Sequence, residues 1–112
     1  RPYHRFCVNY EPFFFAWKGE MREFTKTSNC TMEFDIDRKK EDRQHPAQKP
    51  QSLYENLIEI SSHKGMTVLD PFLGSGISLA VAKKMGREII GIEKEDSWFQ
   101  LATHNLHEIG GS

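Results

Sequence analysis

Two short segments, Val68–Gly76 and Gly91-Ile92-Glu93, restrict the possible folds of this chain more than any other part of its sequence. The apolar and glycine pattern around them predicts a strand over 66–69, a loop over 70–76, a helix over 77–85 and a strand over 88–92. Gly86 is well placed as the C-terminal cap of that helix. A strand-loop-helix-strand unit of this length predicts a right-handed parallel crossover, and therefore an α/β fold.

Both polar segments follow the carboxyl ends of predicted strands, which is where open α/β sheets bind their ligands. The small residues Gly74, Ser75 and Gly76 let a ligand approach the backbone, with the exposed amides of a helix N-terminus behind them. Glu93 presents a carboxylate suited to accepting two hydroxyl protons from a ribose. Together the two segments predict a site for a nucleoside-containing ligand.

The loop favours S-adenosylmethionine over a dinucleotide. A full G-x-G-x-x-G pattern would need a third glycine, and Leu79 stands there. Asp70 would repel a pyrophosphate but attract an ammonium or a sulfonium group. A dinucleotide-binding oxidoreductase module is the weaker alternative. The structural alternatives are an ordinary strand-to-helix turn for the glycine loop and a helix-start carboxylate for Glu93.

Other elements are predicted around this unit. Two prolines in 45–50 prevent a helix until after Pro50, and Ser52 with Glu55 then forms a capping-box pattern for a helix that Lys64-Gly65 closes. Its apolar face is predicted from Leu53, Leu57, Ile58 and Ile60 or Ser61. A last helix is predicted over 95–107 and a flexible tail over 110–112. Nearer the N-terminus, the aromatic run 5–17 predicts one or two buried strands rather than a platform for stacking bases, and 32–36 a short strand.

Size and composition limit the chain to one modest domain. It has 112 residues, a formal net charge of -1 and two cysteines, Cys7 and Cys30, with no signal-peptide pattern or long apolar run. The nearly balanced charge gives no sign of a nucleic-acid partner. Two cysteines are too few for a disulfide framework, so a reducing cytoplasm fits best. His104 and His107 lie three residues apart without a third ligand, so no metal site is predicted. Because the sequence begins at Arg1 rather than Met, we interpret it as a fragment.

Several spaced motifs occur in a recognisable order: 45–50, 69–76, Gly86-Arg87 and Gly91-Ile92-Glu93. They resemble the bacterial and phage DNA N6-adenine and N4-cytosine methyltransferases, in the permuted class whose catalytic half precedes the cofactor half. The resemblance is clear over 44–106 and weaker over 10–19. It implies a Rossmann-like α/β fold of the S-adenosylmethionine-dependent methyltransferases, present in part with an incomplete sheet. The implied divisions are strands and a remnant of the target-recognition region in 1–43, the cofactor-binding region in 44–109, and the tail in 110–112.

The same resemblance implies a set of cofactor-binding residues. The loop from Asp70 would wrap the methionine part, with Phe72 helping to wall the site, and Glu93 would hold the ribose hydroxyls. Lys49 would lie near the cofactor's carboxylate. The full set is Gln48, Lys49, Pro50, Asp70, Pro71, Phe72, Gly74, Ser75, Gly76 and Glu93. Two threonines usually follow the second glycine in the family; here Ile77 and Ser78 replace them, so one hydroxyl is missing.

The catalytic tetrapeptide of the family, Asp/Asn/Ser-Pro-Pro-aromatic, does not occur in this sequence. In the permuted order it would precede Arg1. We therefore predict no catalytic residue, and a chain that is inactive alone. The expected partners are double-stranded DNA, reached through the full-length enzyme, and the missing catalytic half or a partner chain. A homodimer that pairs through exposed sheet edges is a further possibility. No membrane is expected. A non-catalytic remnant that binds DNA or a partner is the remaining alternative.

Overall fold

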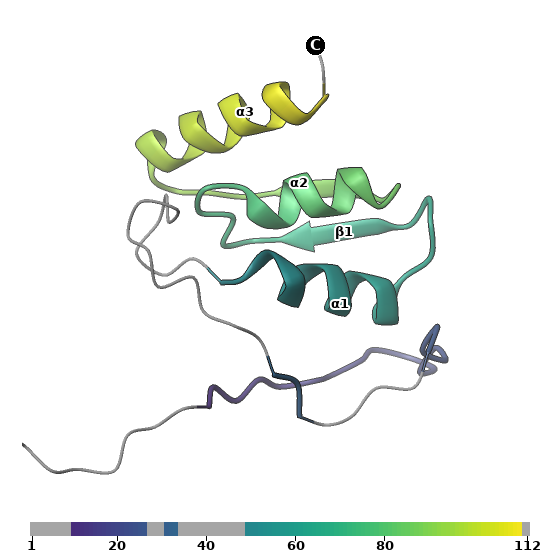
Figure 1. Cartoon of the computed structure of the whole chain (residues 1–112). Coiled ribbons are helices and arrows are strands. Elements are labelled where there is room, and N and C mark those ends of the chain that lie inside the picture. Colours follow the sequence, from purple (N-terminus) through teal and green to yellow (C-terminus); the bar gives the residue numbers. More distant parts are fainter. Residues whose placement is uncertain (1–9, 27–30, 34–48, 111–112) are drawn as a thin grey trace, which may run out of the picture.

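The computed structural model describes residues 10–26, 31–33 and 49–110 of the 112-residue chain. Within them the elements are α1 (Gln51–Ser61), β1 (Thr67–Asp70), α2 (Ile77–Lys84), β2 (Glu88–Gly91) and α3 (Asp96–Gly110). The strand-loop-helix-strand order predicted for 66–92 is confirmed, and the last helix runs three residues past the predicted end. Figure 1 shows α2 and the strands between α3 on one side and α1 on the other.

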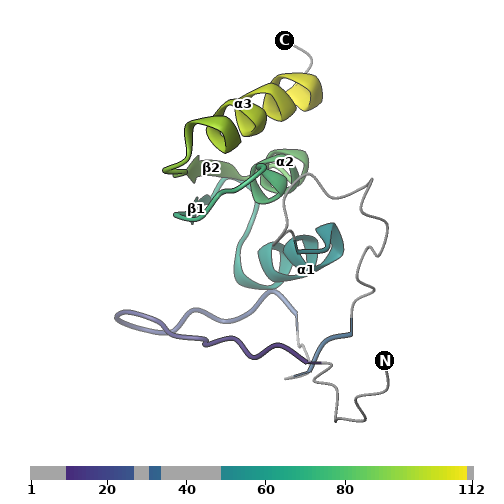
Figure 2. The same ribbon diagram turned by 90° about the vertical axis from the view of Figure 1, so that its left-hand side faces the viewer.

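The two strands pair in parallel, with Thr67 opposite Glu88 and Asp70 opposite Gly91. This pairing confirms the predicted crossover, because α2 connects the two strands and packs on one face of them (Figure 2). Ile89 packs against the core on that face. Along β1 and β2 the less exposed residues alternate with exposed ones, and among the latter Leu69 and Ile90 keep 60% and 56% of their surface accessible. The described sheet is therefore covered on one face only.

The core lies between α1 and α2. Its buried members are Ile58, Val81 and Ala82, and Tyr54, Ile77, Met85 and Ile89 pack against them. The helical spacing of apolar residues in 53–60 predicts this face correctly at Ile58. It omits Tyr54, one turn earlier on the same side of the helix.

The start of α1 differs from the prediction. The helix begins at Gln51, with Pro50 at the N-cap position and no side-chain cap, so the capping box at Ser52 and Glu55 does not form. Pro50 has a φ of −58°, and its carbonyl accepts the amide of Leu53 at 3.1 Å, so the backbone closes the first turn unaided. Glu55 instead accepts a hydrogen bond from Gln51 at 2.8 Å.

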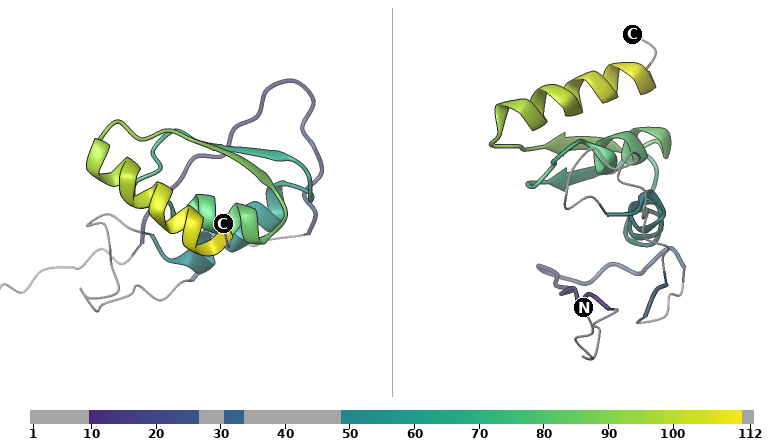
Figure 3. Two further views of the ribbon diagram at one scale, coloured as in Figure 1. Left: turned by 90° about the horizontal axis from the view of Figure 1, so that it is seen from above. Right: turned by 60° about the vertical axis from the view of Figure 1, so that its left-hand side comes forward.

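The aromatic segment does not form the predicted strand where the structure describes it. Residues 10–17 are extended but unpaired, and Phe14 is 99% exposed; residues 5–9 of the predicted strand lie outside the described residues. The segment lies beyond α1, away from the sheet (Figures 1 and 3), so no strand edge is within reach. Since a strand exists only by pairing, its pattern alone cannot form one. Met32 and Glu33 are likewise unpaired, and 34–36 are outside the described part.

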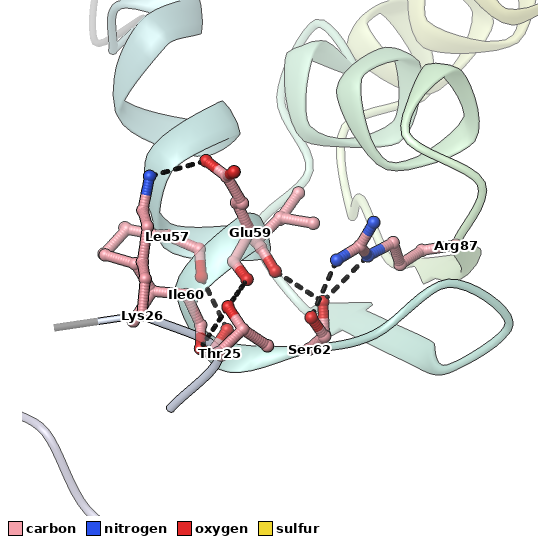
Figure 4. Close-up of polar contacts among 9 residues, drawn as sticks. Thr25, Lys26, Leu57, Glu59, Ile60, Ser62 and Arg87 are labelled. Carbon is pink, nitrogen blue, oxygen red and sulfur yellow. Dashed lines mark hydrogen bonds and ion pairs between the residues drawn. The ribbon is translucent and has the colours of Figure 1, made fainter. Parts of the chain in front are cut away.

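Thr25 and Lys26 fasten this segment to the end of α1 (Figure 4). The Thr25 amide donates to the Ile60 carbonyl at 3.0 Å, and its hydroxyl donates to the Glu59 carbonyl. Lys26 Nζ lies 2.7 Å from a Glu59 carboxylate oxygen. The last carbonyls of a helix have no partner inside it, so these bonds satisfy groups that α1 leaves open.

Arg87 joins the ends of α1 and α2, as Figure 4 also shows at Ser62. Its guanidinium donates to the Ser62 hydroxyl at 3.0 Å, to the Ser62 carbonyl at 2.7 Å and to the Met85 carbonyl at 2.8 Å. Beside it, the predicted helix cap is confirmed: Gly86 follows α2 in a left-handed conformation. Among the described residues, no helix combines the length and the apolar character that crossing a membrane requires.

Candidate functional site

The structure brings the glycine loop, 70–76, and the segment Gly91-Ile92-Glu93 together at the carboxyl ends of β1 and β2. The Ile92 amide donates to the Asp70 carbonyl at 2.8 Å, and the Leu73 amide donates to the Ile92 carbonyl at 2.9 Å. The Gly74 amide then donates to a carboxylate oxygen of Glu93 at 2.7 Å. The glycine loop and the acid after β2 therefore face a common site.

A cleft of about 940 Å³ opens at this point. Its walls come from α1 and the residues before it, from β1 and the loop after it, from the start of α2, and from the segment after β2. Pockets for small molecules have volumes of roughly 300–1,000 Å³ and mostly apolar walls with a few polar groups. Leu57, Phe72 and Ile92 supply apolar surface here, while Asp70 and Glu93 supply carboxylates.

The Asp70 carboxylate braces the glycine loop. One oxygen accepts the Phe72 amide at 3.0 Å, and the other accepts the hydroxyl of Ser78 in the first turn of α2. Each carboxylate oxygen has two lone pairs, so both can accept a further bond from a ligand cation. Asp70 thus fixes the loop and still presents negative charge to the cleft.

Glu93 likewise both accepts backbone hydrogen bonds and lines the cleft. Besides the Gly74 amide, it accepts the Glu95 amide at 3.1 Å, just before α3 begins. The helix-start alternative therefore describes real contacts of this side chain. These contacts also hold its carboxylate on the cleft wall beside the loop, which is where a ribose-binding acid is expected.

Most of the predicted cofactor-binding residues gather at the cleft. The lining includes seven of them: Lys49, Asp70, Pro71, Phe72, Gly74, Ser75 and Glu93. Of the described candidates, Pro50 and Gly76 lie outside the lining, and Gln48 is outside the described residues. Lys49 also pairs with Glu11 at 2.5 Å, so its ammonium is shared with the N-terminal segment.

The packing of α3 against the start of α2 leaves no room for a side chain at Gly76. It is buried at the start of α2 with a φ of +90°, and a Cβ there would lie 2.9 Å from the Cβ of Ala102 in α3. Real Cβ atoms do not approach so closely. The second glycine of the motif therefore allows α3 to lie against α2, whereas Gly74 and Ser75 form the cleft surface.

Tyr54 and Leu57 line the cleft but were not predicted as site residues. Burial and the negative charge of Asp70 raise the pKa of the Tyr54 phenol above its ordinary value of 10.0. Spacing could have indicated Tyr54, because it lies four residues after Pro50 and four before the buried Ile58, on the helix face that packs against α2. Across the described residues, no group of three or more His, Cys, Asp and Glu side chains is arranged to hold a metal ion.

Comparison with known proteins decides the family. A family model described as DNA methylase, of the N6/N4 type, matches residues 7–104. The chain belongs to this family. One similar protein is the type II methyltransferase M.HinfI of Haemophilus influenzae, which is 36% identical over 95% of this chain and 30% of the relative. Another is the type II methyltransferase M2.DpnII of Streptococcus pneumoniae, which is 45% identical over 55% of this chain and 23% of the relative.

Solved structures share the fold of more than half of this chain. M1.HpyAVI in complex with S-adenosylmethionine has a TM-score of 0.56 and 42% identity, over 59% of this chain and 33% of that one. TTHA0409 of Thermus thermophilus, described as a putative DNA modification methylase and also complexed with S-adenosyl-L-methionine, gives 0.52 and 36%, over 55% of this chain and 25% of that one. The chain thus spans about a third or less of the length of these relatives. The α/β methyltransferase fold, present in part, is confirmed, and the oxidoreductase alternative receives no support.

Proposed function

We propose that this chain binds S-adenosylmethionine as the cofactor-holding part of a DNA amino-methyltransferase that acts on adenine N6 or cytosine N4. The observation that carries the proposal is the bond from the Gly74 amide to Glu93, which places the glycine loop, Asp70 and the acid after β2 around one cleft. The two methylase structures solved as complexes with this cofactor support it.

The cleft residues fit the chemistry of the cofactor. Glu93 is an acceptor for the ribose diol, and Asp70 offers negative charge to the ammonium of the methionine part. Ile92 and Phe72 provide apolar surface for the adenine ring, although Phe72 is 88% exposed before anything packs on it. Lys49 can approach the carboxylate if it leaves Glu11.

The contribution of this chain to methyl transfer is binding and orientation. The bound cofactor supplies a methyl group activated by the adjacent sulfonium. The glycine loop would hold the methionine part and Glu93 the ribose, which lie on either side of the sulfonium, so these residues would restrict the orientation of the cofactor in the cleft. A flipped base of double-stranded DNA would be held by a catalytic half or partner chain that carries the missing tetrapeptide, and a second copy of this chain is a further candidate partner. The expected compartment is the cytoplasm.

Calorimetric titration with S-adenosylhomocysteine and with NAD tests the cofactor assignment. We expect S-adenosylhomocysteine to bind with a 1:1 stoichiometry and NAD to bind far more weakly or not at all. Tight NAD binding without a response to S-adenosylhomocysteine would refute the proposal. Methyl transfer to DNA by this chain alone would refute the expectation that it is inactive without a catalytic partner.

The ribose role of Glu93 needs a design that separates it from loop bracing, because Glu93→Ala also removes the acceptor for the Gly74 and Glu95 amides. A cycle separates them: wild type and Glu93→Gln are each titrated with S-adenosylhomocysteine and with its analogue that lacks both ribose hydroxyls. If Glu93 binds the diol, wild type discriminates strongly between the ligands and the variant does not. A variant that weakens both ligands equally would show that Glu93 only shapes the loop.

A further inference from the structure

Tyr54 of α1 lines the same cleft as the glycine loop. Its ring packs against the core formed by Ile58, Val81 and Ala82, so the side chain is held in place by the fold. The same residue lines the cleft together with Asp70. A fixed aromatic ring that ends in a polar group on a cavity wall is well suited to orienting a ligand.

The hydroxyl of Tyr54 is not fully buried. Among the residues the structure describes, none donates to it or accepts from it. Among the described residues, Asn56 Oδ1 is the side-chain oxygen that is buried and has no partner. The Tyr54 hydroxyl has no partner either but is not in that class, so it keeps accessible surface. Because Tyr54 lines the cleft, a ligand bound there can approach this oxygen.

The charged neighbour of Tyr54 indicates which part of a ligand it meets. Burial raises the pKa of the phenol, and Asp70 is the carboxylate whose charge raises it further. Because Asp70 and burial both raise the pKa of the phenol and favour its protonated form, Tyr54 is a hydrogen-bond donor at all physiological pH values. The amino-acid end of a ligand would put its ammonium near Asp70, and its carboxylate, one carbon away, would then be within the reach of a donor on α1.

We propose that Tyr54 is a cofactor-binding residue whose hydroxyl donates a hydrogen bond to the carboxylate of the methionine part of S-adenosylmethionine, opposite the Asp70 loop. This role rests on the proposed function above and assigns a residue that the motifs of the sequence do not indicate. It gives α1 a direct part in selecting a ligand with an amino-acid tail over a plain nucleoside.

The test is Tyr54→Phe, titrated with three ligands: S-adenosylhomocysteine, its decarboxylated analogue, which keeps the ammonium, and 5′-methylthioadenosine, which has neither group. The variant should lose about tenfold in affinity for S-adenosylhomocysteine, the lower end of what a hydrogen bond to a charged group contributes. Its affinity for the other two ligands should not change. Because the hydroxyl has no protein partner among the described residues, the variant keeps the core contacts of the ring, and its thermal midpoint should match that of wild type.

Tyr10→Phe is the matched control, since Tyr10 is 75% exposed and does not line the cleft. It should bind all three ligands as wild type does. Equal affinities of wild type and Tyr54→Phe for S-adenosylhomocysteine would overturn the inference, and so would an equal loss for the decarboxylated analogue, which would place the phenol at the ammonium or the thioether. If wild type itself does not bind S-adenosylhomocysteine, the proposed function fails, and this role fails with it.

Discussion

Gly76→Ala should destabilise the fold through a collision that the geometry defines. The new Cβ would lie 2.9 Å from the Cβ and 3.1 Å from the Cα of Ala102, and the backbone at this position has a φ of +90°. Left-handed backbone costs a residue with a Cβ about 1–2 kcal/mol, and overpacking a close contact costs about 1–3 kcal/mol more. The total is about 2–5 kcal/mol, a large part of the stability of any small domain.

Gly65→Ala separates the two contributions. Gly65 has a φ of +87°, nearly that of Gly76, but a Cβ there would meet no atom within 4 Å. The backbone strain and the entropy lost by the unfolded chain are then similar in both variants, and their difference reports the collision with Ala102. We expect a difference of about 2 kcal/mol, which for a domain of this size corresponds to about 8–16 °C in the midpoint of thermal unfolding.

Thermal unfolding followed by circular dichroism measures both variants against wild type. A double variant, Gly76→Ala with Ala102→Gly, adds a second check because it removes the Cβ that Gly76→Ala strikes. It should be less destabilised than the sum of the single changes, even though glycine inside α3 costs about 1 kcal/mol. Equal midpoints for Gly76→Ala and Gly65→Ala, or strictly additive losses in the double variant, would refute the idea that α3 contact sets the size of this residue.

Three further predictions concern residues outside the motif. Arg87→Ala removes three hydrogen bonds at the ends of α1 and α2 and should lower the free energy of unfolding by about 1–3 kcal/mol in a urea titration, whereas the same change at the exposed Arg22 should cost far less. Thr25→Val keeps the backbone bond to Ile60 but loses the hydroxyl donor, so amide hydrogen exchange in 10–26 should accelerate while exchange in the α1–α2 core is unchanged. The pKa of Tyr54 is raised in the folded state, so the unfolded chain loses that proton first and stability should fall as pH rises above about 10. Tyr54→Phe should remove this part of the fall, and urea unfolding that shows the same loss of stability above this pH in wild type and in Tyr54→Phe would contradict the raised pKa.

The parts of the fold that the sequence predicts correctly are those specified by nearby residues. β1, α2, β2 and the cap at Gly86 all lie within the 25 positions 67–91, and each is marked by periodicity or glycine placement. The parallel pairing follows because a crossover of this length has few alternatives. The convergence of the glycine loop and Glu93 on one cleft is a consequence of that pairing, so most of the site could be predicted with it.

The failures concern contacts with distant partners or choices between similar local solutions. The run 10–17 has strand composition, but composition cannot supply the neighbouring strand, and the segment lies unpaired beyond α1. At the start of α1, Ser52 has the residue type of a helix cap, but the helix begins two residues earlier in the chain, with Pro50 at the N-cap position. Tyr54 was missed as a site residue because an aromatic on a core-facing helix position is usually only part of the core, and its second role depends on where β1 places Asp70.

The bonds that stabilise the loop of this domain involve the same atoms that would bind a ligand. Asp70 and Glu93 each accept two hydrogen bonds from the loop or from the helix starts beside it, so neither carboxylate is free to reorient when a ligand arrives. A site held in this way loses little conformational entropy on binding, which favours affinity for a small cofactor. The same arrangement means that simple removal of either acid cannot distinguish a ligand contact from a structural one. Only a change made on the ligand and on the protein together, as in the ribose cycle for Glu93 above, separates the two roles.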